Sequence, residues 1–158
     1  MHHRTTTTVT TLILCACLLL SGCSARARQR DLIRNDPMAS ATWDGIEFLG
    51  SKESEDDGPK PPPTSMTRCF ATDLPLEEAF DRILTTAKQN GWNNEYANGP
   101  KVRIISKNTS EGGMEIILST ILARCEQYPA ANIRLAIQKP GALEATRDVG
   151  LRIYRERN

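Results

Sequence analysis

The stretch LEEAFDRILTTAKQNGW, residues 76–92, decides the fold because its pattern predicts one amphipathic helix with a clear start and end. Glu77 and Glu78 in the first turn complement the positive end of the helix dipole. Gly91 is a typical stop signal, and Trp92 is predicted to fold back as the hydrophobic residue of the C-terminal cap. Such a helix needs a second layer to bury its apolar face, which is formed by Leu76, Ala79, Phe80, Ile83, Leu84 and Ala87.

Segments with alternating apolar residues on both sides of this helix predict that second layer. KNTSEGG separates two of them, and its Gly112-Gly113 pair suits a hairpin loop. The order of strand, helix and four further strands predicts an α+β fold, a two-layer sandwich of one helix on a mainly antiparallel sheet of about four to five strands. The predicted strands are SMTRCFAT (65–72), KVRIIS (101–106), MEIILSTIL (114–122), NIRLAIQ (132–138) and VGLRIYR (149–155).

The chain before residue 65 is expected to lie largely outside this globular domain, which we place at 65–158. Residues 51–64, SKESEDDGPKPPPT, are acidic and rich in proline, so they predict a linker. WDGIEFLG, residues 43–50, favours a short strand whose contact with the domain the sequence leaves open. Residues 23–42 show no strong periodicity and predict a flexible tether.

Residues 1–22 have the organisation of an export leader. MHHR supplies a positive start, and VTTLILCACLLL is shorter than the roughly 20 apolar residues of a membrane-spanning helix. The next residues, Leu20-Ser21-Gly22-Cys23, resemble the lipobox of bacterial lipoproteins. The resemblance implies that Cys23 carries a diacylglyceryl thioether and becomes the first residue of the mature chain. The competing interpretation is an ordinary secretory signal that is cut after Ala25-Arg26-Ala27.

The overall organisation also resembles that of small lipoproteins from high-GC Gram-positive bacteria. This resemblance implies attachment to the extracytoplasmic face of the cell membrane. Ser24 is not the aspartate that signals inner-membrane retention, so an outer-membrane destination stays open for a Gram-negative cell. The sequence allows two roles, contact with anionic headgroups or a solvated tether, for Arg26, Arg28, Arg30 and Arg34.

The five cysteines divide by position. Cys15 and Cys17 lie in the leader, and Cys23 is assigned to the lipid. This leaves Cys69 and Cys125, an even pair in an oxidising compartment, for which we predict one disulfide. The alternative is two buried free thiols.

The residue inventory argues against most enzymatic chemistry. Both histidines, His2 and His3, lie in the leader, so the mature chain lacks the base of Ser-His-Asp and Cys-His catalysis and the ligand of common zinc sites. Glu77 and Asp81 lie one turn apart, and an exposed helix face explains them better than a catalytic pair. We therefore expect a non-catalytic protein with no metal and no cofactor. With 20 basic and 19 acidic side chains, nothing favours nucleic acid as a partner.

Two hypotheses for function follow. The first is an envelope module that binds a protein or a cell-wall component, and the second is a carrier of a small ligand or lipid with a cavity between helix and sheet. Four arginines recur on or just beyond the last two predicted strands: Arg134, Arg152, Arg155 and Arg157. Simple solvation of an exposed sheet face explains them best, and a basic face that binds an anionic polymer is the weaker alternative.

Overall fold

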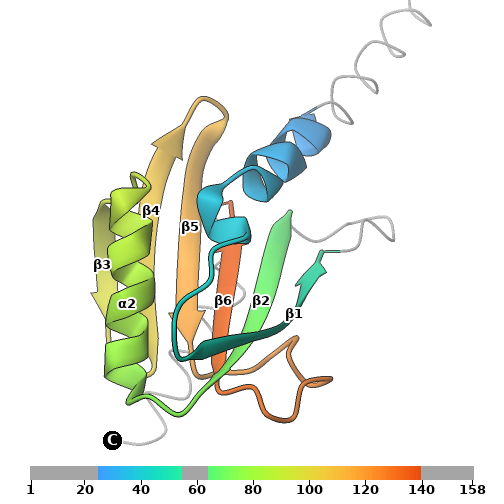
Figure 1. Cartoon of the computed structure of the whole chain (residues 1–158). Coiled ribbons are helices and arrows are strands. Elements are labelled where there is room, and N and C mark those ends of the chain that lie inside the picture. The colour runs from blue at the N-terminus through green and yellow to red at the C-terminus, as the bar shows by residue number, and fades with distance from the viewer. Residues whose placement is uncertain (1–24, 55–63, 140–158) are drawn as a thin grey trace, which may run out of the picture.

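The computed structural model describes residues 25–54 and 64–139 (Figure 1). Six antiparallel strands form one sheet in the order β1-β2-β6-β5-β4-β3. The fold is α+β as predicted, and its sheet is larger than the four to five strands expected. The elements are η1 (Pro37–Ala39), β1 (Ile46–Glu53), β2 (Ser65–Thr72), α2 (Leu76–Gln89), β3 (Asn94–Asn98), β4 (Val102–Thr109), β5 (Gly112–Ser119) and β6 (Ile133–Gln138).

The helix α2 has the bounds and the packing that its sequence predicts. Five of the six residues of its predicted apolar face are buried, whereas Leu76 in the first turn is exposed. Figure 1 shows the helix in front of one face of the sheet. The cap is also confirmed, because the N–H of Trp92 donates to the carbonyl of Ala87 at 3.1 Å and the N–H of Gly91 donates to that of Lys88 at 3.2 Å. Gly91 has φ 84°, and the side chain of Trp92 is fully buried.

Alternate residues of the strands complete this core, as expected for a sheet with one face under a helix. The predicted strand 65–72 is confirmed as β2, and the predicted hairpin is confirmed as β4 and β5. Thr109 pairs with Gly112, so the hairpin turn is shorter than expected and Gly113 lies within β5. The residues that pack against α2 include Met114, Ile116, Leu118, Ile133, Leu135 and Ile137.

The prediction for the other strands missed one strand and included one that the described residues do not cover. The polar edge strand β3, NEYAN, was not predicted, because it lacks the apolar alternation that identified the others. The strand predicted at 149–155 lies outside the described residues, as do residues 1–24 and 55–63.

The structure departs from the predicted domain boundaries on the N-terminal side. Residues 25–34 are helical, and Ile33 and Met38 are 2% and 0% exposed in the same core as α2. Residues 25–42 are therefore not the flexible tether that was predicted. Their few apolar side chains anchor the segment because the sheet offers them an apolar surface, which local periodicity does not reveal.

The boundary between strand and linker also moves. β1 continues to Glu53 and pairs with β2, and the N–H of Ser54 donates to the carbonyl of Ser65 at 2.8 Å. Residues 51–54 of the predicted linker are thus paired with β2, and residues 55–63 lie outside the described part of the chain. The domain begins by residue 25 and not at residue 65.

The other face of the sheet carries the predicted cysteine pair. Sγ of Cys69 in β2 lies 2.03 Å from Sγ of Cys125, which belongs to the loop between β5 and β6. Both residues are buried and pack with Ala131. The structure thus brings together the two cysteines that were predicted to pair, and their link holds the loop on this face.

Candidate functional site

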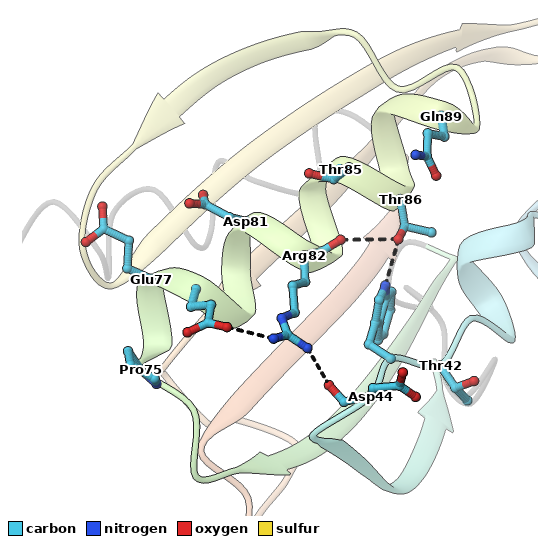
Figure 2. A pocket seen from close by; sticks show the side chains of 11 residues that line it. Thr42, Asp44, Pro75, Glu77, Asp81, Arg82, Thr85, Thr86 and Gln89 are labelled. Atoms are coloured by element: carbon cyan, nitrogen blue, oxygen red, sulfur yellow. Dashed lines mark hydrogen bonds and ion pairs between the residues drawn. The ribbon is translucent and has the colours of Figure 1, made fainter.

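An open groove of about 860 Å³ lies between the exposed side of α2 and the segment 42–44 (Figure 2). It combines one short segment from the N-terminal part of the domain with almost the full length of the helix. The groove is lined by Thr42, Trp43, Asp44, Pro75, Glu77, Glu78, Asp81, Arg82, Thr85, Thr86 and Gln89.

Hydrogen bonds hold segment 42–44 in place beside the helix. The indole N–H of Trp43 donates to Oγ1 of Thr86 at 2.8 Å, and its ring packs edge-on against Phe70 at 5.5 Å between centroids. One guanidinium nitrogen of Arg82 donates to the carbonyl of Asp44 at 2.9 Å, and another donates to Glu78 at 2.7 Å. Figure 2 shows the Trp43–Thr86 and Arg82–Asp44 bonds between the segment and the helix, and the Arg82–Glu78 bond along the helix. The two walls of the groove are therefore joined before any ligand binds.

The side chains around the groove are mainly acidic. Asp44, Glu77, Glu78 and Asp81 contribute carboxylates, and Arg82 is the single basic residue of the lining. Glu77 and Asp81, the carboxylates noted in the sequence, contact the same guanidinium of Arg103 in β4.

Arg103 limits what these two carboxylates can do chemically. Its side chain is 10% exposed, whereas those of Asp81 and Glu77 are 62% and 84% exposed. The carboxylates thus cover a buried cation and remain open to solvent on the other side. This arrangement suits ion pairing and hydrogen-bond acceptance, as expected for an exposed helix face.

A second hollow of about 590 Å³ adjoins the groove, since Trp43 and Asp44 line both. It lies at the end of the sheet where β2 finishes. There the side chain of Asn132 donates to the carbonyl of Thr72 at 2.6 Å and accepts from its N–H at 3.1 Å. These bonds fix the floor of the second hollow. Trp43 and Asp44 thus form the ridge between two neighbouring concave surfaces.

Arg68 explains how the chain just before the groove is fixed to the sheet. It is 2% exposed, and one of its nitrogens donates to the carbonyls of Met38 and Ala41 at 2.9 and 2.8 Å. Its guanidinium lies 4.8 Å from the ring centroid of Phe48 and 4.9 Å from that of Phe70. Burial lowers the pKa of Arg68 to about 10, so it stays protonated at neutral pH. Its role is to hold the segment that leads into Trp43.

Comparison of the chain with protein-family profiles, curated sequences and solved structures finds no match. The described residues contain no helix that is long and apolar enough to span a membrane. In that same part of the chain, no group of three or more potential metal ligands comes together.

The remaining predicted site residues have mixed outcomes. Cys23 lies outside the described residues, as do Arg152, Arg155 and Arg157. Arg134 lies on the sheet face that carries the disulfide, where burial lowers its pKa and one of its nitrogens donates to the carbonyl of Ala123 at 3.5 Å. That contact is structural, so the position of Arg134 gives no support to a basic binding face.

The interface between α2 and the sheet bears on the carrier hypothesis. Phe80 and Ile83 of the helix and Phe70, Trp92 and Ile105 from the rest of the core are at most 1% exposed and belong to one cluster. In the described part of the chain, side chains occupy the space where a carrier would hold its ligand. The concave surfaces lie instead on the outer side of α2 and at the end of β2.

Proposed function

We propose that this chain is a bacterial lipoprotein, anchored through Cys23 to the extracytoplasmic face of a membrane, and that its domain binds a protein or wall component of the envelope. The lipobox supports the anchor, and the paired cysteines fit an oxidising compartment. The absence of histidine from the mature sequence supports binding rather than catalysis.

The observation that carries the binding role is the groove between α2 and segment 42–44. Its walls are already joined by the Trp43–Thr86 and Arg82–Asp44 hydrogen bonds, so a ligand meets a preformed surface. Small-molecule sites are usually enclosed and mostly apolar, whereas this groove is open and lined by charged and hydroxyl side chains. It therefore suits a segment of a larger partner.

Charge defines the chemistry of that segment. Arg82 and Arg103 neutralise part of the acidic charge of the lining through their ion pairs, and its four carboxylates still outnumber these two cations. The remaining negative charge favours basic or amide groups, because complementary charges speed encounter and disfavour acidic partners. Trp43 adds an aromatic surface at the centre of the two hollows. A protein segment or wall peptide with lysine, arginine or amide donors has this chemistry.

Site-specific photo-crosslinking in intact cells tests the binding role. A photoreactive residue at Thr85 stands in the groove, and one at Lys88 provides the matched control, because it is exposed on the same helix outside the lining. The proposal expects a defined adduct from position 85, none from position 88, and loss of the adduct when Asp44→Lys reverses a charge of the lining. Equal adducts from both positions, or no adduct from either, would contradict it.

A further inference from the structure

The helix at residues 25–34 is fixed to the domain by one buried side chain and by ion pairs with the β4–β5 turn and with β1. Its Ile33 is buried in the core. Nε of Arg28 lies 3.3 Å from a carboxylate oxygen of Glu111 in the β4–β5 turn. Arg34 binds Glu53 at the end of β1 through two hydrogen bonds of 2.8 Å each. Exposed ion pairs are individually weak. Together with the buried side chain of Ile33, however, these two pairs set the orientation of the helix relative to the sheet.

The chain between this helix and the proposed lipid is very short. Ser24 is the single residue between Cys23 and Ala25, where the described helix starts. Two Cα–Cα steps span at most roughly 7.6 Å, far less than a flexible tether of twenty residues would. The lipid is thus attached almost directly to a packed helix.

We propose that the anchor holds the domain itself against the membrane surface, with the end of the sheet that carries the β4–β5 turn facing anionic phospholipid headgroups. This inference rests on the proposed lipidation of Cys23. Arg28 lies three residues, about 4.5 Å along the helix axis, from Ala25, and its partner Glu111 is in that turn. The turn is thus close to the point where the lipid enters the bilayer.

The composition of the helix fits this partner. ARARQRDLIR contains four arginines and one aspartate, and each basic residue near an anionic surface contributes on the order of 1 kcal/mol. Arg34 binds Glu53 and Arg28 binds Glu111, and such pairs within the domain reduce the net attraction. The charge therefore supplements the lipid and favours one orientation.

The same geometry places the second hollow, which adjoins the groove, away from the bilayer. Figure 1 shows the helix at 25–34 near the β4–β5 turn at one end of the strands, and the connection from β2 to α2 at the opposite end. β2 has eight residues, which span about 26 Å. Asp44 and Asp73, which line the second hollow, lie at that far end. A ligand in the envelope would reach this hollow, and the end of the groove beside it, without contact with lipid.

Spin labels at the two ends of the sheet test how the full, lipidated chain is oriented on the membrane. Ser110→Cys places a thiol in the β4–β5 turn, and Asp73→Cys places one at the far end of the sheet; both positions are exposed. In the mature protein, Cys23 would be acylated and the other two cysteines are paired, so the new thiol is the reactive one. Each labelled protein is reconstituted into phosphatidylglycerol vesicles, and collision of the nitroxide with a water-soluble nickel complex is measured.

The proposal expects several-fold lower nickel collision at position 110 than at position 73. A flexible Gly/Ser linker inserted between Ser24 and Ala25 should remove that difference. Fatty-acid labelling of the same preparations separates the two proposals: without labelled lipid on Cys23, both fail. If the lipid is present and the two positions collide equally in the protein without the linker, docking of the domain fails and lipidation stands.

Discussion

Asp36 offers the sharpest test of whether the N-terminal segment belongs to the domain. It precedes η1, where one carboxylate oxygen accepts the N–H of Met38 at 2.9 Å and the other contacts Nζ of Lys107 in β4. The side chain of Asp36 is 2% exposed and that of Lys107 is 17% exposed. Nζ of Lys107 also lies 4.6 Å from the ring centroid of Trp92. This ion pair thus links the segment before the groove to the main sheet.

Asp36→Ala should lower the free energy of unfolding by about 3 to 5 kcal/mol, the usual result of removing one partner of a buried ion pair. A domain of ordinary stability has about 5 to 15 kcal/mol, so the loss would be large. The assay is equilibrium unfolding in urea under oxidising conditions, followed by the fluorescence of Trp43 and Trp92. Asp31→Ala is the control, because Asp31 is exposed on the same segment, and its effect should stay within about 0.5 kcal/mol.

A double variant tests whether the unpaired charge of Lys107 causes the loss of stability in Asp36→Ala. Asp36→Ala combined with Lys107→Met should recover part of the lost stability, since it removes the second charge and keeps an aliphatic side chain next to Trp92. If Asp36→Ala is no more destabilising than Asp31→Ala, the segment is not packed on the sheet. The account of the groove and of the docked helix would then fail as well.

Three further outcomes are expected. Replacing Cys69 and Cys125 by alanine should lower the free energy of unfolding by about 4 kcal/mol in the chain-entropy model, given their separation of 56 residues, and unaltered urea midpoints would argue against the link. The hydrogen bond from Arg34 lowers the pKa of Glu53 below its ordinary value of 4.5. The ion pair therefore stabilises the fold fully above pH 4.5, and this stabilisation is lost as the pH falls through the lower pKa of the folded state. Glu53→Gln should therefore cost less than about 1 kcal/mol at neutral pH and nothing in acid, and a difference that grows in acid would refute this sign. A Cβ at Gly50 would lie 1.9 Å from the hydroxyl of Tyr128. Gly50→Ala should therefore destabilise the wild-type domain by about 1 to 3 kcal/mol, and it should destabilise a Tyr128→Ala variant much less. Equal effects in the two backgrounds would contradict the contact.

The elements that could be predicted from the sequence are those whose pattern is local and repeated. The fourteen residues of α2 carry a full apolar face, and Ile133, Leu135 and Ile137 alternate cleanly along β6. Such patterns persist because each residue on the buried side contributes to the same core. The disulfide could also be predicted from the sequence. Once the leader and Cys23 are assigned, only two of the five cysteines are left to pair in the expected oxidising compartment.

The N-terminal segment was missed because its stability comes from contacts far away in the chain. Ile33 and Met38 are too few to give a periodic pattern, yet both are buried on a surface that β-strands later in the sequence provide. Arg68 holds the same segment through its carbonyls, a contact that no local pattern encodes. Polar β3 was missed for the same reason, since pairing with β4 defines it.

The groove shows a similar limit. Glu77 and Asp81 were noted as an exposed pair, and the structure places them in the lining and against Arg103. Trp43 was an isolated aromatic in the sequence. Its hydrogen bond to Thr86 crosses 43 residues and creates the second wall of the groove. The amphipathic pattern of α2 identified its exposed side but not the segment beside it.

Lipidation of Cys23 is the claim on which both proposals depend, and metabolic labelling with a fatty acid tests it most directly. Wild type and Cys23→Ser are expressed in parallel, and label and membrane fractionation are measured on each. The account predicts labelled, membrane-bound wild-type protein and an unlabelled variant that is released from the membrane on washing. Equal labelling of the two proteins, or an unlabelled wild type, would contradict it.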